Sequence, residues 1–284
     1  MELSQSHESL DPRYQAILDG CEPYLVTYPG NLKALDLAPF GVATPEARIY
    51  DPTTLRSRTV IDCLHHLDAF SFGGQDMLMP RWVLFDCGEF PGIVYGFGKV
   101  ARDLDDEVRA AYHVTGKEHD DSFVPLSMWV ALRCAEEGAW FGHNLSSANL
   151  VATQNPFPGL ATITKAFAVR LTRATRQYGA TQWSSKSLNI HLSLGVMRLL
   201  CAYTPAHTHP ETFAYRIDVD AESLLAPLRP GWKRPDAGGD RHLDAGDSVA
   251  IRTLHDEIEA GGAWSLLRVE RRPKAPQRLW LQGA

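Results

Sequence analysis

The chain has 284 residues, of which 44% are hydrophobic and 22% are charged, and its formal net charge is −6. This composition is typical of a globular protein with one large domain and additions, and the negative charge disfavours nucleic-acid binding through an overall positive potential. No apolar run approaches the ~20 residues of a membrane span, and the polar first residues lack a signal-peptide core. We therefore expect a cytoplasmic protein with no nucleic-acid partner and no membrane partner.

The spacing of cysteines and histidines indicates neither a disulfide framework nor a metal site. The five cysteines are far apart, odd in number and without a Cys-x-x-Cys pair, which predicts free thiols in a reducing compartment. His65 and His66 are adjacent on a predicted helix, where they point about 100° apart. His207 and His209 lie in a proline-containing loop with no third ligand at a confirming spacing. We predict that no metal is bound.

Short helices and strands are predicted in the first third of the chain. An Asp-Pro pair occurs at residue 11 and again at residue 51, and each combines a capping side chain with a proline suited to the first turn of a helix. The first predicted helix ends at Gly20 and the second ends before Gly73, while residues 23–28 between them predict a strand.

Two pairs of strands are predicted next. Residues 81–87 and 92–98 are apolar runs joined by turn residues, which predicts an antiparallel hairpin. Residues 124–134 and 139–145 predict a second pair, turned at Gly138.

The segment from residue 154 to residue 201 combines turn, helix and anion-binding signals. Pro156 and Pro158 end the preceding strand, and Gly159 opens an amphipathic helical pattern that runs to Tyr178, with Gly179 as its end. A helix start presents unpaired N–H groups and the positive end of the dipole, which suits a phosphate or pyrophosphate. The alternative is a solvated helix start.

This predicted helix is cationic. We expect its four basic side chains on the helix surface, where they face solvent or meet an acidic partner. They are Lys165, Arg170, Arg173 and Arg176.

The rest of the chain continues the alternation of strands and helices. Residues 181–183 predict a short strand, residues 184–194 a short helix and residues 196–203 another strand. Towards the C-terminus, a strand, a Pro/Gly-rich linker, a capped helix and two terminal strands are predicted, over residues 213–219, 229–246, 248–259, 264–270 and 278–282.

The order of these elements resembles the core of the GCN5-related N-acetyltransferase (GNAT) superfamily, over roughly residues 80–205. In that family a loop Arg/Gln-x-x-Gly-x-Gly/Ala opens a helix, and a strand and a short helix ending in Tyr-x-x-Leu-Gly follow. Gly159 and Ala161 match the small positions of the loop, and the Leu-Gly pair at residue 194 matches the closing pair. Two positions depart: Pro156 stands where the Arg or Gln belongs, and His191 stands in place of the tyrosine.

The resemblance implies a fold and a domain plan. The fold class is α/β, a mixed and twisted central sheet flanked by helices, with N- and C-terminal extensions. Residues 51–220 form the GNAT-like acyltransferase domain, residues 1–50 an N-terminal extension, and residues 221–284 a C-terminal extension that packs on the core.

The resemblance also implies acyl transfer from acyl-CoA, such as acetyl-CoA, or a related thioester to an amine on a small-molecule acceptor. By the motif, the pyrophosphate of coenzyme A lies at the loop and helix start, and the second strand of the preceding pair binds the pantetheine arm. The residues predicted to bind the cofactor are Pro158, Gly159, Leu160, Ala161 and Thr162.

Direct acyl transfer needs a base for the ammonium proton and benefits from an acid for the thiolate. By the motif, His191 occupies the position of the family's acid, and the alternative is a histidine packed at the helix end. Glu136, Glu137 and His143 are candidates for the base, and we favour His143 because its strand can direct it into a cleft. Trp140, Asn144 and Trp183 are predicted to line the acyl or acceptor pocket.

Two other functions keep the fold. One is a GNAT-like decarboxylase or S-acyltransferase that acts on an acyl carrier protein, for which the cationic helix would supply the docking surface. The other is a GNAT-like binding module without catalysis, which Pro156 favours because it removes a side chain and a backbone donor from the loop.

Overall fold

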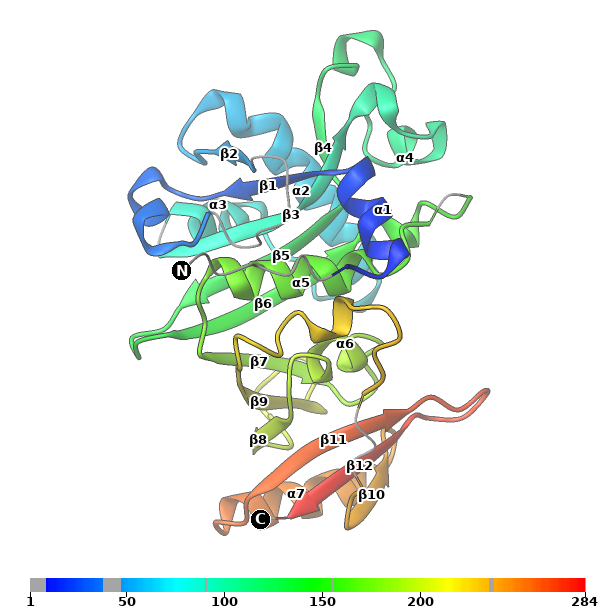
Figure 1. Cartoon of the computed structure of the whole chain (residues 1–284). Helices are drawn as coiled ribbons and strands as arrows, with labels where there is room; N and C mark the ends of the chain where they lie inside the picture. Colours follow the sequence, from blue (N-terminus) through cyan, green and yellow to red (C-terminus); the bar gives the residue numbers. More distant parts are fainter. Residues whose placement is uncertain (1–8, 38–46, 90, 155, 235–237, 284) are drawn as a thin grey trace. The chain divides into compact units, whose positions relative to one another are not determined.

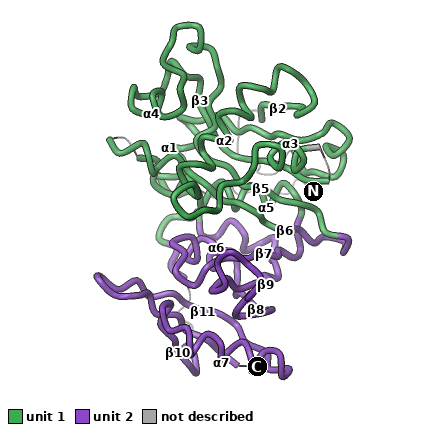
Figure 2. Tube along the Cα trace, turned by 180° about the vertical axis from the view of Figure 1, so that it is seen from behind, with its two compact units in different colours: residues 1–134, 142–173, 228–231 green, residues 135–141, 174–227, 232–284 purple. Residues whose placement is uncertain are grey.

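The protein is described by a computed structural model that covers residues 9–37, 47–89, 91–154, 156–234 and 238–283. The chain forms two compact units, coloured separately in Figure 2. Unit 1 contains residues 1–134, 142–173 and 228–231, and unit 2 contains residues 135–141, 174–227 and 232–284. Of the predicted N-terminal extension, residues 1–8 and 38–46 lie outside the described residues.

Unit 1 is built on a mixed sheet. Its strands are β1 (Glu22–Val26), β2 (Arg48–Tyr50), β3 (Gly92–Val100), β4 (Phe123–Pro125), β5 (Ser127–Arg133) and β6 (Ala139–Ser147), of which β6 begins in unit 2. Their order is β6-β5-β3-β1-β2, and β4 also pairs with β3. The β1–β3 and β3–β5 pairs are antiparallel, whereas β1 and β2 are parallel.

Helices cover both faces of this sheet. They are α1 (Pro12–Gly20), α2 (Arg58–Phe72), α3 (Arg81–Glu89), α4 (Asp106–Ala111) and α5 (Leu160–Leu171), joined by 3-10 turns η1 (Pro29–Ala34), η2 (Leu55–Ser57), η3 (Gly73–Gln75), η4 (Ala101–Asp103), η5 (Lys117–His119) and η6 (Ala148–Leu150). α1 and α5 lie on one face and α2 and α3 on the other (Figure 1).

The core of unit 1 lies on both faces of β3 and β5. Successive residues Met128 and Trp129 are both buried, so neither face of β5 meets solvent. Ser127 and Thr164 share a side-chain hydrogen bond of 2.7 Å, which joins β5 to α5. At Gly96 a Cβ would overlap the carbonyl oxygen of Ser127, so the two strands approach closely only because that residue is glycine.

Unit 2 carries an antiparallel sheet. Its elements are β7 (Arg176–Gln182), α6 (Leu188–Leu192), β8 (Met197–Cys201), β9 (Thr212–Asp218), β10 (Arg241–Asp244), α7 (Ser248–Glu259), β11 (Trp264–Glu270) and β12 (Arg278–Gly283), with a 3-10 turn η7 (Ala226–Leu228) at its border with unit 1. The strand order is β10-β12-β11-β8-β9-β7. The pairs β7–β9, β8–β9, β8–β11, β11–β12 and β10–β12 are antiparallel.

Several predicted elements are confirmed. α1 begins after Asp11, whose carboxylate accepts the Arg13 N–H at 3.1 Å, and ends at Gly20. The strand pair at residues 124–145, the strand at 213–219, the helix at 248–259 and the two terminal strands are all present. The α/β fold class, a mixed and twisted sheet flanked by helices, is likewise confirmed (Figure 1).

Other predicted elements are wrong. Residues 81–87 form the helix α3, because Leu84 and Cys87 recur at the three-residue spacing of a helix face and both are buried. The second Asp-Pro pair forms a turn, and α2 begins only at Arg58. Within the predicted linker, residues 241–244 form β10, while residues 235–237 lie outside the described residues.

The cationic helix is also shorter than predicted and differently exposed. α5 ends at Leu171, and Gly179 lies inside β7. Lys165 is fully buried. Arg173 and Arg176 follow the helix, where they form ion pairs with Asp36 and Glu136. The four-cation helix face is therefore not formed.

No helix in the described part of the chain is long and apolar enough to cross a bilayer.

Candidate active site

The start of α5 in unit 1 is formed by a glycine in a left-handed conformation. Gly159 is the N-cap residue with φ +86°, in the left-handed region that favours glycine. A Cβ at this position would lie 2.5 Å from Cε1 of Tyr14, a buried residue of α1. The Tyr14 hydroxyl hydrogen-bonds the Thr162 side chain, while burial raises the tyrosine pKa. α1 therefore packs directly against the first turn of α5.

The first turn of α5 leaves two backbone donors for an anion. Pro158 has no N–H, the Leu160 N–H donates to the Phe157 carbonyl at 3.1 Å, and the Thr162 N–H donates to the Gly159 carbonyl at 2.9 Å. Within the described part of the chain, no acceptor meets the N–H groups of Gly159 and Ala161, the two small positions of the motif. Of the five predicted cofactor residues, these two can offer backbone N–H groups.

Side chains hold the loop that precedes α5. Asn149 clamps Phe157 through two hydrogen bonds, donating from Nδ2 to its carbonyl at 2.9 Å and accepting its N–H at 2.8 Å. Lys99, the half-buried penultimate residue of β3, places its Nζ 5.5 Å from the centre of the Phe157 ring. A positive charge thus lies beside the loop, which favours an anion at the helix start.

His143 in β6 belongs to a hydrogen-bonded chain that ends at a buried carboxylate. Its Nδ1 lies 2.7 Å from Oδ1 of Asn144, and Nδ2 of Asn144 donates to Oδ1 of Asp68 at 2.7 Å. The other oxygen of Asp68 accepts the Met79 N–H at 2.6 Å. His143 is exposed, Asn144 is buried and Asp68 in α2 is fully buried.

This chain determines where the proton of His143 lies. Both oxygens of Asp68 act as acceptors, so the amide nitrogen of Asn144 faces Asp68 and its oxygen faces His143. In the neutral ring, Nδ1 therefore carries the hydrogen and Nε2 holds the basic lone pair. Burial raises the pKa of Asp68, and the two N–H donors and the nearby His65 and His143 oppose that rise.

Two further histidines of unit 1 lie next to each other. The rings of His66 in α2 and His113 are 4.8 Å apart, and burial together with the charges of His113 and His65 lowers the pKa of His66. In the part of the chain that the structure describes, no group of three or more histidines, cysteines and carboxylates could hold a metal ion.

The second predicted base, Glu136, lies in unit 2 and is engaged elsewhere. It forms an ion pair with Arg176 and accepts the Tyr178 hydroxyl at 2.9 Å. Its carboxylate thus ties the turn before β6 to the start of β7, which is a structural role.

The remaining predicted site residues also belong to unit 2. His191 in α6 is buried, its Nε2 lies 3.0 Å from Oγ of Ser187, and its ring centre is 5.5 Å from that of Tyr215. Trp140 is buried as well. The pairing of His143 in unit 1 with His191 in unit 2 stays a prediction, as does the proximity of Asn144 to the two tryptophans.

Trp183 is a core residue and also a pocket wall. It is fully buried, stacks on Phe213 with ring centres 4.1 Å apart, and donates from Nε1 to the Ala202 carbonyl at 2.8 Å. Trp183 also borders a cavity of about 350 Å³ in unit 2, together with Tyr203 and Glu211.

Sequence reasoning missed three side chains that shape these sites. Asp68, Asn149 and Lys99 contact residues that are distant in the sequence, and the partner of Asp68 is 76 residues away. Local spacing carries no signal for such contacts, because only the folded sheet and α2 bring them together.

No protein-family model and no curated protein matches this chain. Among solved structures, it is similar to the NatC complex bound to Gag peptide and CoA, with 11% identity, 60% of this chain and 97% of that chain covered, and a TM-score of 0.41. It is also similar to diaminobutyrate acetyltransferase EctA from Paenibacillus lautus in complex with L-2,4-diaminobutyric acid and coenzyme A, with 11% identity, coverages of 56% and 89%, and a TM-score of 0.38. A GNAT-family acetyltransferase from Desulfovibrio desulfuricans has 15% identity, coverages of 56% and 93%, and a TM-score of 0.34.

Proposed function

We propose that the protein transfers an acyl group from acyl-CoA, or a related thioester, to the amine of a small-molecule acceptor by direct attack. The observation that carries this proposal is the chain from Asp68 through Asn144 to His143. It holds the imidazole ring at an exposed position on β6, with Nδ1 turned towards Asn144. A histidine at such a position can take a proton from the ammonium of the acceptor, which frees the lone pair that attacks the thioester.

Each residue has a role in this mechanism. His143 takes one proton from the acceptor ammonium, and the lone pair that this frees attacks the thioester carbonyl carbon. The carbon–sulfur bond then breaks, and the remaining proton on the nitrogen of the adduct passes through His191 to the departing thiolate. Trp140, Asn144 and Trp183 are proposed to line the acyl or acceptor pocket, and the cavity beside Trp183 supports that role. Glu136 is not proposed as a base, because Arg176 and Tyr178 hold its carboxylate.

The co-substrate is proposed to bind through its pyrophosphate at the start of α5. The N–H groups of Gly159 and Ala161, the positive end of the helix and the charge of Lys99 together provide for an anion there. Acetyl-CoA or another acyl-CoA fits this chemistry. The acyl-carrier alternative loses the observation that favoured it, because Lys165 is buried and the cationic helix face is not formed.

Binding of the co-substrate is the first test of the proposal. Titration calorimetry with acetyl-CoA, malonyl-CoA and coenzyme A should detect binding, and Lys99→Ala should weaken it by about tenfold, since one charge-assisted contact contributes about 1.5–3 kcal/mol. Lys33→Ala, which removes an exposed lysine from η1, serves as the matched control and should leave the affinity unchanged. No binding by the wild-type protein would exclude the CoA-dependent reaction.

The role of His143 is tested with the enzyme saturated in acetyl-CoA and supplied with a panel of amines. His143→Gln should lower the rate of thiol release by about 10²–10⁴-fold, the usual contribution of a general base, without weakening acetyl-CoA binding. His207→Gln, at an exposed histidine of unit 2, is the control and should retain full activity. If the wild-type protein binds acetyl-CoA but acylates no amine, the non-catalytic alternative takes precedence.

A further inference from the structure

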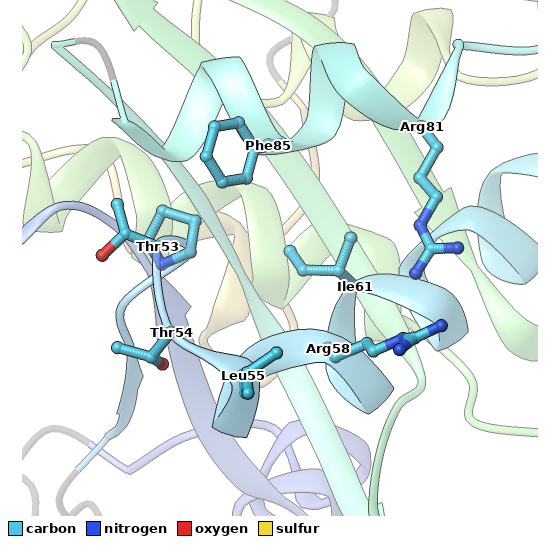
Figure 3. A pocket seen from close by; sticks show the side chains of 8 residues that line it. Thr53, Thr54, Leu55, Arg58, Ile61, Arg81 and Phe85 are labelled. Carbon is cyan, nitrogen blue, oxygen red and sulfur yellow. The ribbon is translucent and has the colours of Figure 1, made fainter.

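We propose that the groove between the first turns of α2 and α3 in unit 1 binds a small organic carboxylate with a short apolar chain or ring. The groove encloses about 370 Å³ and lies between Arg58, Ile61, Arg81 and Phe85, with Leu55 at its rim. Figure 3 shows the two guanidinium groups at one end and the apolar side chains in the middle. The inference is independent of the acyl transfer proposed above, because it uses none of the residues assigned to that reaction.

The charged end of the groove suits a single negative charge. Arg58 is the first residue of α2 and Arg81 the first residue of α3, and Figure 3 shows their guanidinium groups at the same end of the groove. Asp62, one turn after Arg58, forms an ion pair with Arg81. Together these three side chains carry one net positive charge, which matches one carboxylate better than a doubly charged phosphate.

The apolar part of the groove follows from helical spacing. Arg58 and Ile61 are three residues apart on α2, and Arg81 and Phe85 are four residues apart on α3, so each helix presents a cation and an apolar side chain on one face. Ile61 is only 6% exposed and forms the floor. Leu55 is 88% exposed, and a ligand that covered it would remove apolar surface from water.

The size of the cavity limits the ligand. Sites for small molecules usually enclose about 300–1,000 Å³, and this groove lies at the lower end of that range. A carboxylate with a short alkyl chain or a single aromatic ring fits these dimensions, whereas a long fatty chain exceeds them.

The test compares hexanoate, hexanol and hexyl phosphate, which contain six carbon atoms each, by titration calorimetry on the full-length protein. Hexanoate should bind at least about tenfold more tightly than hexanol, because only the carboxylate meets the two guanidinium groups. Comparable binding of hexanol, or tighter binding of hexyl phosphate than of hexanoate, would overturn the proposal.

Variants then assign the binding to this groove. Arg58→Ala should weaken hexanoate binding by about tenfold, whereas Arg56→Ala, an arginine two residues away that does not line the groove, should leave it unchanged. Asp62→Asn should strengthen binding, since it releases Arg81 from its ion pair. Equal losses in the two arginine variants, or no change with Asp62→Asn, would place hexanoate elsewhere. Thermal melting of each variant confirms that the fold is intact.

Discussion

Lys165 is a charged residue in the centre of α5 where the helical pattern alone predicts a surface. It is fully buried, and burial lowers the pKa of its ammonium group well below the usual value. Its neighbour Thr164 hydrogen-bonds Ser127 of β5, so this side of the helix packs on the sheet. α5 is thus buried on more sides than an amphipathic surface helix, and a lysine in such a helix reduces the free energy of unfolding below the usual lysine pKa.

Replacing this lysine should therefore stabilise the protein. Lys165→Met keeps an unbranched side chain and should raise the free energy of unfolding at pH 7, because the ammonium group that burial disfavours is removed. Urea denaturation measures the change. Lys117→Met, at an exposed lysine of unit 1, is the control and should change stability by less than about 0.5 kcal/mol.

The stability that Lys165→Met adds should depend on pH, because burial lowers the pKa of Lys165 in the folded state. The folded state releases the Lys165 proton at a lower pH than the unfolded state does, so the unfolded state binds more protons between the two pKa values. Wild-type stability should rise with pH across that window, up to the unfolded value of about 10.4, and the advantage of Lys165→Met should shrink accordingly. An advantage that stays constant from pH 7 to pH 10 would contradict the assignment.

Among the secondary-structure elements, those with local signals were predicted and those fixed by tertiary packing were not. The Asp11 and Asp247 caps mark the starts of α1 and α7 because a side chain and a backbone N–H a few residues apart suffice for a cap. α3 was predicted as a strand, since a short apolar run does not distinguish a buried strand from a buried helix. The segment forms a helix, in which Leu84 and Cys87 both pack in the core.

In the candidate site, too, residues with a local sequence signal could be predicted and those positioned by tertiary contacts could not. Gly159, Ala161 and His143 could be selected from the sequence because their motif and strand are local. The support of His143 by Asp68 could not, because the contact joins β6 to α2 through Asn144.

The contribution of a helix cap to stability can be tested at the start of α7. Asp247 accepts the Ala250 N–H at 2.9 Å, so Asp247→Ala should lower the free energy of unfolding by about 1 kcal/mol. Asp256→Ala removes an exposed carboxylate from a later turn of the same helix and is the control. Equal effects of the two substitutions in urea denaturation would show that charge, and not capping, determines the loss.

At the scale of the whole molecule, the thiols distinguish the core of unit 1 from more accessible positions. Cys21, Cys63 and Cys87 are buried in unit 1, whereas Cys134 and Cys201 are partly exposed. Burial raises the pKa of Cys21 to about 11, of Cys63 to about 12 and of Cys87 to about 11. Only a thiolate reacts readily with a disulfide reagent, so the three buried thiols are protected both by exclusion of the reagent and by their protonation.

We expect two of the five thiols to react with Ellman's reagent in the native protein and three to react only on unfolding. A Cys134→Ser/Cys201→Ser double variant removes the reactive pair, so that any remaining signal reports on unit 1 alone. As urea is increased, the three protected thiols should become reactive in one transition, because they share a single core and a cooperative unit exposes its interior together. Mass spectrometry of the labelled peptides identifies each thiol. If one of the three reacts at a much lower urea concentration than the others, its part of unit 1 opens separately, and the unit is not a single cooperative core.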